Sequence, residues 1–202
     1  MKRKTAALFA AMLLFAAHSL AASAPEYSPE DRQALRAIAH DAIAAKLDGK
    51  PYSLPKNLPA KFLEPRGAFV TLKRNGHLRG CIGRIVSNDP LAATIAEMAQ
   101  AAAFEDPRFP PLDPSEFPSV ALEISVLTPP APIASIRNIT VGVHGLIMRN
   151  GLHSGLLLPQ VPTEYGWDKI TFLEETCAKA GLQQNCWKDP ATRMETFSAE
   201  VF

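Results

Sequence analysis

The sequence predicts an α+β fold, in which antiparallel hairpins alternate with separate helices, rather than a parallel doubly wound sheet. Asn-Gly pairs at 75–76 and 150–151 each stand between two extended runs, and this is a strong hairpin signal because both residues tolerate a positive φ. Three other segments carry apolar residues at helical spacing. With 202 residues, 47% of them hydrophobic, the chain can bury a core in one compact unit or in two small lobes.

Residues 1–21 have the pattern of a signal peptide. A basic stretch at 2–4 precedes an uncharged apolar run at 6–17, and small residues at the accepted spacing end at Ala21. The run is too short to cross a bilayer comfortably as a permanent helix. We expect cleavage after Ala21, a periplasmic or secreted protein, and a single mature domain of residues 22–202 without a membrane anchor. A retained anchor and a misassigned start codon are the alternatives.

The charge of the chain gives no reason to expect a nucleic-acid partner. There are 21 basic and 20 acidic side chains, and removing the three basic residues of the leader leaves 18 against 20, a net charge of about −2. A mildly acidic protein has no electrostatic attraction to a phosphate backbone or an anionic lipid surface. The sequence also contains no phosphate-binding glycine loop, GxSxG or HExxH motif, so nucleotide-dependent and zinc-hydrolase chemistries have no local support.

The first predicted helix begins after Ser28, a capping residue followed by Pro29 and by two acidic residues at the positive end of the helix dipole. It should stop at 49–51, where glycine, lysine and proline follow one another. Four prolines in 51–66 predict a connecting loop. A strand at 68–72 then leads through the first Asn-Gly turn into a second strand.

Gly80 and Gly83 fall in this second strand, where missing side chains permit a bulge or the close approach of another backbone. Asn88-Asp89-Pro90 should cap a second helix, which ends before a stiff turn at 106–111. A third strand is predicted at 120–127.

The second half of the chain follows a proline-rich connector at 129–132, which is the best internal boundary. Strands at 145–148 and 152–158 form the second hairpin through 149–151. A helix opened by Trp167-Asp168 and closed by Gly181 comes next, and the final strand is predicted at 193–202.

The three cysteines, Cys81, Cys177 and Cys186, are an odd number for a compartment that favours disulfides. If Cys177 and Cys186 pair, Cys81 remains as a free thiol. No CxxC or paired Cys/His spacing indicates a structural zinc site, and we assign neither a metal site nor a cofactor.

Four stretches of the sequence stand out together. They are LRGCIG (78–83), AAFEDPRFPPL (102–112), GLLLPQV (155–161) and the segment from Trp167 to Asp189. In this order and at this spacing they resemble the AMMECR family, known in many microbes as AmmeMemoRadiSam system protein A. The resemblance covers roughly Glu30 to Phe202.

The resemblance implies two unequal lobes, built from mainly antiparallel sheets with packed helices, and a cleft between them near the LRGCIG segment. It implies no settled reaction. Family members are associated with a Memo-type protein and a radical SAM protein, which implies a role accessory to redox or radical chemistry. Most relatives look cytosolic, and an exported copy could not work beside a cytosolic radical SAM enzyme.

Cys81 is the main chemical candidate. The guanidinium of Arg79 could favour its thiolate, provided that no bulge at Gly80 separates the two side chains. His144 or His153 could act as a catalytic base if strand pairing brings it to Cys81. The competing interpretation is that Cys81 is a small buried hydrophobic residue.

The candidate ligand-binding residues are Arg79, Gly80, Gly83 and Arg108, because guanidinium groups and backbone amides can bind an anion. A local ion pair between Asp106 and Arg108 is the favoured alternative for Arg108. Three hypotheses follow. The first is a binding domain whose interlobe cleft holds a small ligand or a partner segment, the second is a thiol-dependent enzyme using Cys81, and the third is a metal-binding protein using Cys81 and a histidine.

Overall fold

The computed structural model describes residues 26–202, and the predicted signal peptide lies outside the described residues. The elements, in chain order, are α1 (Pro29–Leu47), β1 (Ala68–Arg74), β2 (His77–Arg84), α2 (Leu91–Phe104), β3 (Val120–Leu127), β4 (Ala131–Pro132), β5 (His144–Asn150), β6 (His153–Leu157), α3 (Gln160–Glu164), α4 (Lys169–Lys179) and β7 (Arg193–Val201). Short 3-10 turns connect several of them. The α+β prediction is confirmed, with helices packed against an antiparallel sheet.

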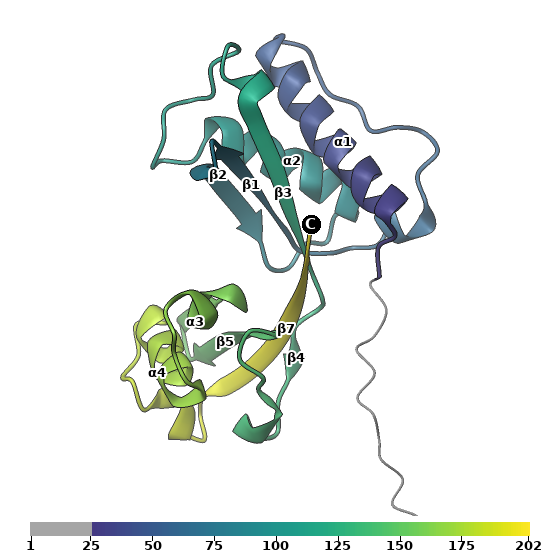
Figure 1. Ribbon diagram of the computed structural model, residues 1–202. Coiled ribbons are helices and arrows are strands. Elements are labelled where there is room, and N and C mark those ends of the chain that lie inside the picture. Colours follow the sequence, from purple (N-terminus) through teal and green to yellow (C-terminus); the bar gives the residue numbers. More distant parts are fainter. Residues whose placement is uncertain (1–25) are drawn as a thin grey trace, which may run out of the picture.

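One seven-stranded sheet runs through two lobes in the order β2-β1-β3-β7-β5-β6, with β4 paired to β7. The larger lobe holds β1, β2 and β3, and the smaller lobe holds β4, β5 and β6 (Figure 1). Strand β7 belongs to both, because Ala199–Val201 pair with β3 and Arg193–Ser198 pair with β5. The two lobes are therefore interlocked by the last strand of the chain.

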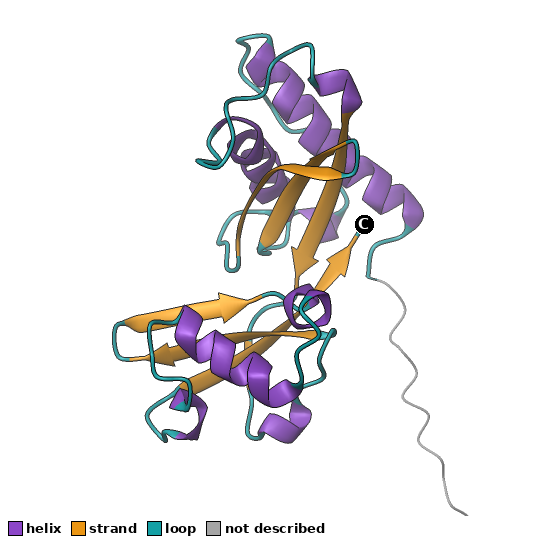
Figure 2. Ribbon diagram, turned by 60° about the vertical axis from the view of Figure 1, so that its left-hand side comes forward, coloured by secondary structure: helices purple, strands orange, loops and turns teal. Residues whose placement is uncertain are grey.

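The main helices cover one face of the sheet, which we call the outer face. Helix α2 packs against β1 and β2 in the larger lobe, with α1 beside it, and α4 packs against β5 and β6 in the smaller lobe (Figure 2). The strand residues that point toward the helices form a separate buried core in each lobe. Alternate residues point to the opposite side, which we call the inner face.

The sheet curls so that inner-face side chains of the two lobes meet. Leu127, Ile147 and Phe197 are almost fully buried there. The side chains packed around them are Phe69, Ile85, Leu156, Leu158 and Ala199. This apolar cluster fills the centre of the inner face and leaves polar side chains on either side of it.

Helix α1 begins as predicted. The Ser28 hydroxyl accepts a hydrogen bond from the Asp31 amide at 3.2 Å, and the Asp31 carboxylate accepts one from the Ser28 amide at 2.8 Å. This reciprocal capping box satisfies two backbone donors that the first turn would leave unpaired.

Two local predictions were wrong in detail. Helix α2 has Pro90 at its N-cap and no side-chain cap, because Ser87 instead accepts hydrogen bonds from the Asp89 amide and the Thr94 hydroxyl. The second hairpin turns at Gly151 and Leu152, one residue later than predicted, since β5 extends through Asn150 and Gly151 has a positive φ of 58°. The first hairpin turns at Asn75 and Gly76, both at positive φ, as predicted.

Cys177 of α4 is joined by a disulfide to Cys186, nine residues later. The pairing considered from the sequence is confirmed, and Cys81 is left as a free thiol. Within residues 26–202, no helix is both long and apolar enough to cross a membrane.

Reduction of this disulfide is expected to lower the free energy of unfolding by about 2–3 kcal/mol, since the bond closes a short loop in the unfolded chain. Denaturant unfolding with and without reductant measures the effect. The reductant should act equally on a Cys81→Ser variant and have no effect on a Cys177→Ser/Cys186→Ser variant. Three free thiols in unreduced protein from its native compartment would contradict the pairing.

Candidate functional site

Cys81 lies on β2, an edge strand of the sheet, directly opposite Thr71 of β1. Thr71 and its other neighbour, Glu123 of β3, also form a direct cross-strand pair, so the three side chains form one row on the inner face. The Thr71 hydroxyl donates a hydrogen bond to the Cys81 sulfur at 3.2 Å. Because Cys81 is only half-buried, its sulfur lies at a partly open surface rather than in the core.

The backbone of Cys81 is held from the open side of the edge strand by two side chains. Its amide donates to the Asp106 carboxylate at 2.8 Å, and its carbonyl accepts from the Arg108 guanidinium at 3.1 Å. Asp106 and Arg108 are themselves paired at 2.7 Å. This pair occupies the place that a neighbouring strand would take, so it satisfies both backbone groups of Cys81.

The Asp106–Arg108 pair has a strong electrostatic effect. The Asp106 side chain is only 2% exposed. Hydrogen bonds from Arg108, followed by that from the Cys81 amide, hold the pKa of the Asp106 carboxyl well below its usual range. The pKa of Arg108 is raised, chiefly by its hydrogen bond to Asp106 and further by the nearby Cys81 sulfur. The favoured sequence interpretation, an ion-paired turn, is confirmed, and the structure adds its contact with β2.

Arg79 does not share a face with Cys81. The pairing of β1 and β2 shifts between Leu72 and Lys73, so Arg79 is the extra residue of a bulge beside Gly80. Its side chain instead reaches Glu116, with a closest distance of 2.8 Å. Phe109 lies beneath the guanidinium groups of both Arg79 and Arg108.

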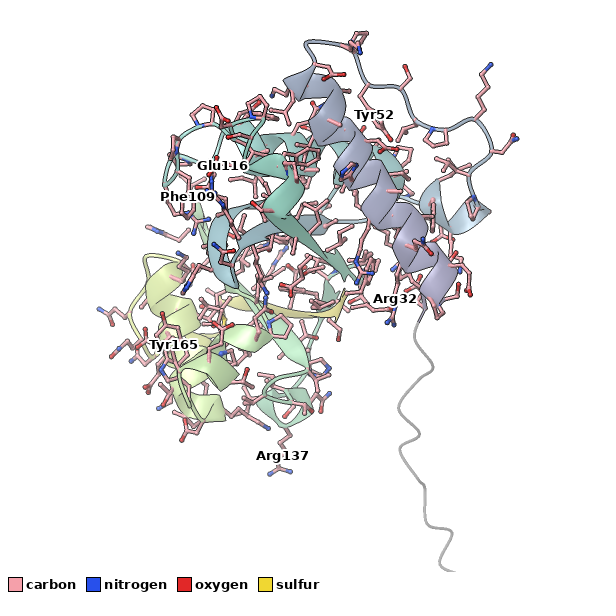
Figure 3. The ribbon with its side chains drawn as sticks, turned by 45° about the horizontal axis from the view of Figure 1, so that its top comes forward. Arg32, Tyr52, Phe109, Glu116, Arg137 and Tyr165 are labelled. Atoms are coloured by element: carbon pink, nitrogen blue, oxygen red, sulfur yellow. A yellow bond between two sulfur atoms is a disulfide. The ribbon has the colours of Figure 1, made fainter. Side chains whose placement is uncertain are left out.

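Phe109 and Glu116 come from the loop after α2, beside the larger lobe (Figure 3). The bonds from Arg79, then that from the Asp113 amide, lower the pKa of Glu116 to about 2. The Nη1 atom of Arg79 is buried without a hydrogen-bond partner. Arg79 therefore anchors this loop to β2, and it makes no contact with the thiol.

The glycines of the LRGCIG segment permit close packing. A Cβ on Gly80 would lie 2.1 Å from the Ala102 carbonyl oxygen in α2. A Cβ on Gly83 would lie 2.2 Å from the Phe69 ring. Both glycines are thus required by their neighbours whether or not their amides bind an anion.

The structure does not bring either histidine to Cys81. His144 is on β5 and His153 on β6, and strands β1, β3 and β7 lie between them and β2. His144 accepts a hydrogen bond from the Thr140 amide at 3.0 Å, and His153 lies near Gly181, just beyond α4. Side-chain alternation places both on the outer face, whereas Cys81 is on the inner face.

Four residues around the thiol could not be assigned to it from the sequence. They are Thr71, Asp106, Lys73 and Glu123. Lys73 pairs with Glu123 at 2.8 Å on the same inner face. Their contacts depend on the order of the strands, for which the sequence carries no local signal. The motif AAFEDPRFPPL did contain Asp106, but nothing in it indicates contact with β2.

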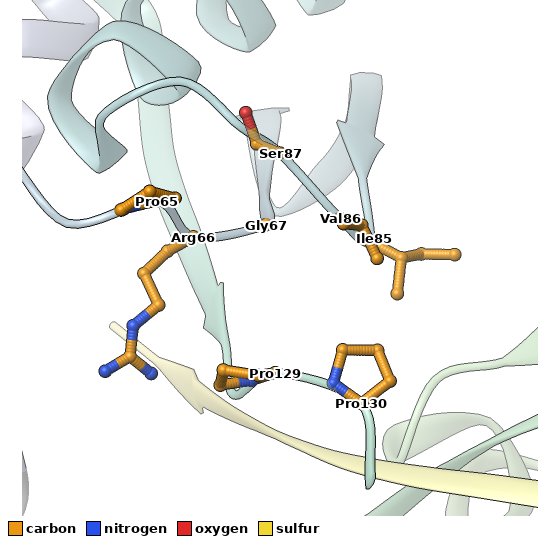
Figure 4. Close-up of a pocket in the computed structure, with 8 residues that line it drawn as sticks. All are labelled: Pro65, Arg66, Gly67, Ile85, Val86, Ser87, Pro129 and Pro130. Atoms are coloured by element: carbon orange, nitrogen blue, oxygen red, sulfur yellow. The ribbon is translucent and has the colours of Figure 1, made fainter.

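A small cavity of about 140 Å³ lies at the junction of the lobes (Figure 4). It is lined by Pro65, Arg66, Gly67, Ile85, Val86, Ser87, Pro129 and Pro130. The LRGCIG segment ends two residues before Ile85, so this cavity is next to the segment and is not lined by it.

Within residues 26–202, no group of three or more His, Cys, Asp or Glu side chains is arranged to hold a metal ion.

The low pKa of Glu116 gives a pH-dependent prediction. A carboxylate whose pKa is lowered by folding stabilises the fold above its ordinary pKa of 4.5, and the contribution is lost as the pH falls toward about 2. A Glu116→Gln variant should be less stable than the wild type at pH 7, and this difference should shrink between pH 4.5 and 2. Urea unfolding across that range measures it, and a difference independent of pH would refute the Arg79–Glu116 assignment.

Comparisons with known proteins identify relatives across most of the chain. The family model described as AMMECR1 matches residues 36–202. A protein of Methanothermobacter thermautotrophicus is 47% identical over 187 residues, which cover 88% of this chain and 97% of that protein. One of Thermococcus gammatolerans is 47% identical over 165 residues, covering 77% of this chain and 80% of that protein. The crystal structure of an uncharacterised Pyrococcus horikoshii protein, PH0010, matches with a TM-score of 0.75 and 44% identity, covering 83% of this chain and 88% of that one.

Proposed function

The chain belongs to the AMMECR1 family, and from that premise we propose that it is a binding domain whose small-ligand site lies on the inner face around Cys81. The ligand stays at the LRGCIG segment, as the sequence predicts, but it binds on the inner face of the sheet and not in the cavity at the lobe junction. The ligand would contact the Cys81 sulfur, with Thr71 and Arg108 beside it.

The main support for this site is the Asp106–Arg108 pair, which bonds the backbone of Cys81 on the edge strand β2. A carboxylate that is 2% exposed has lost most of its hydration, and here it is used to fix the Cys81 amide. Edge strands are ordinarily blunted by exposed charges or covered by other elements. Here the cover is a buried carboxylate with its arginine partner, which together bond both backbone groups of one residue. Fixing Cys81 while its thiol stays half-open is the arrangement expected of a preorganised contact residue.

Binding is preferred over catalysis by a Cys–His pair because of where the histidines lie. General-base activation requires the base within hydrogen-bond reach of the nucleophile. His144 and His153 are on the opposite face of the sheet, several strands away.

Disulfide-capped fragments test the binding proposal in the full mature chain. The Cys81 sulfur attacks the fragment disulfide, forms a mixed disulfide and releases the cap as a thiol. Fragments that bind beside Cys81 should stay attached at reductant concentrations about tenfold higher than the average fragment tolerates, a difference of about 1.4 kcal/mol in local binding. Intact-protein mass spectrometry measures the attached fraction.

A Thr71→Val variant keeps the shape of that side chain and loses its donor, so it should retain Cys81 reactivity but change which fragments are selected. A Val143→Cys variant, which places a thiol at an exposed apolar position of the smaller lobe, supplies the matched control. If all fragments attach equally to Cys81, or if the thiol introduced by Val143→Cys selects the same fragments, the binding proposal fails.

A second candidate, a thiol-dependent enzyme, is favoured by one observation: the half-buried sulfur accepts a hydrogen bond from Thr71, while the Arg108 guanidinium donates to the carbonyl of the same cysteine. The same chemistry would suit an accessory role in redox reactions. An enzyme of this kind should be alkylated rapidly at Cys81 below pH 7.5, while the fold is intact. An inert thiol in the native protein would remove this candidate.

We also propose that residues 1–21 direct export to the periplasm or the exterior of the cell. The basic and apolar leader supports this, and so does the Cys177–Cys186 disulfide, since disulfides persist in oxidising compartments. N-terminal sequencing of the protein from its own cells should begin at Ala22. An intact Met1 in a cytosolic fraction would refute it.

A further inference from the structure

A second charged group lies on the inner face, in the smaller lobe. Arg149 of β5 and Arg193 of β7 are direct cross-strand partners, and both are exposed. Side chains in such pairs have Cβ atoms about 4.5–5.5 Å apart, and like charges placed there repel. The sheet therefore pairs two arginine residues of like charge across neighbouring strands, an arrangement that costs stability.

The surrounding acids do not neutralise both arginines. Arg149 donates to Glu195 at 3.1 Å and to the Ser154 hydroxyl at 3.3 Å, which fix the direction of its guanidinium. In the described part of the chain, no carboxylate lies within salt-bridge distance of Arg193. The two arginines and Glu195 together carry one net positive charge.

Arg193 also borders an open groove of about 430 Å³ between β4 and β7. The groove is lined by Pro132, Ile133, Thr192, Arg193, Met194 and Glu195. It offers room for a small ligand next to the unneutralised charge. This groove shares no residue with the Cys81 site.

We propose that Arg149 and Arg193 form a binding site for a tetrahedral oxyanion, the phosphate or sulfate group of a small ligand seated in this groove. Planar guanidinium groups present paired N–H donors that match the oxygen atoms of such anions. A bound dianion would also replace the repulsion between the two arginines with attraction to both. The site is independent of the ligand proposed at Cys81.

Isothermal titration of the mature chain with sodium phosphate, and separately with sodium sulfate, tests the proposal at constant ionic strength set with chloride. We expect saturable binding of one anion per chain. Arg149→Ala and Arg193→Ala should each weaken it at least tenfold. The matched control is Arg137→Ala, which removes an exposed arginine of the same lobe and should leave the affinity unchanged (Figure 3). Of phosphate and sulfate, the anion that binds more tightly is the one that the site prefers.

Thermal unfolding gives a second readout that also verifies folding of the variants. The preferred anion should raise the Tm of the wild type and of Arg137→Ala, and it should leave the Tm of Arg193→Ala unchanged. The proposal is overturned if neither anion binds saturably, or if Arg137→Ala weakens binding as much as the other two substitutions.

Discussion

Replacing Asp106 with alanine is expected to lower the free energy of unfolding by about 3 kcal/mol, because hydrogen bonds to a buried charged group contribute about 1.5–3 kcal/mol each and the carboxylate regains hydration when the chain unfolds. The substitution removes the acceptor of the Cys81 amide and of the Arg108 guanidinium together. It leaves the Cys81 amide without a partner beside the edge strand. Denaturant unfolding at pH 7 measures the loss.

The matched control for this substitution is Asp113→Ala in the same loop. The Asp113 side chain is exposed and accepts hydrogen bonds only from its near neighbour Ser115, so its removal should cost less than about 1 kcal/mol. A second measurement separates the loss of the Asp106–Cys81 hydrogen bond from general destabilisation. In Asp106→Ala, hydrogen exchange at the Cys81 amide should accelerate relative to the wild type. The Val70 amide, which belongs to the interior strand β1, should accelerate less. Equal effects of the two aspartate substitutions on stability would contradict the assignment.

Gly80→Ala is expected to destabilise the protein by at least about 3 kcal/mol, at the upper end of what overpacking costs. The new Cβ would lie 2.1 Å from the Ala102 carbonyl oxygen, a backbone atom of α2 that no side-chain rotation can move. Helix α2 or strand β2 would have to shift as a whole. Thermal or urea unfolding measures the result.

Two companion substitutions sharpen the Gly80 prediction. Leu78→Ala on the same strand removes a side chain that is 44% exposed and should cost less than about 1.5 kcal/mol. Adding Ala102→Gly to Gly80→Ala should not restore stability, because the clash is with the carbonyl oxygen and not with the Ala102 side chain. Rescue by Ala102→Gly would show that the contact is different from the one described.

The sequence carried enough local information to predict most of the elements. The capping residue Ser28 and the turn at Asn75-Gly76 act through neighbours a few residues away, so their chemistry can be recognised without the fold. The same holds for the ion pair of Asp106 and Arg108.

The contacts that build the candidate site depend on distant parts of the chain. Thr71, Cys81 and Glu123 form one row only because β1 lies between β2 and β3. The continuous sheet depends likewise on β7, which pairs with β3 and β5 at once. The bulge at Arg79 turns that side chain away from the inner face, where regular alternation would have placed it beside Cys81. In the sequence, Gly80 indicated only that a bulge was possible. Pairing order and bulges are settled by packing of the whole molecule, and the sequence does not display them locally.

The central claim is that the inner face around Cys81 is the ligand site, and its most direct test is an amide NMR map of the fragment that stays attached to Cys81 most strongly. The map compares the attached form with a form capped by the small cysteamine group alone. We predict that the shifted resonances cluster on Thr71, Gly83, Arg108 and Glu123, and that those of His144 and His153 do not move. Shifts that are confined to Cys81 itself, or that lie mainly on the outer face, would contradict the claim.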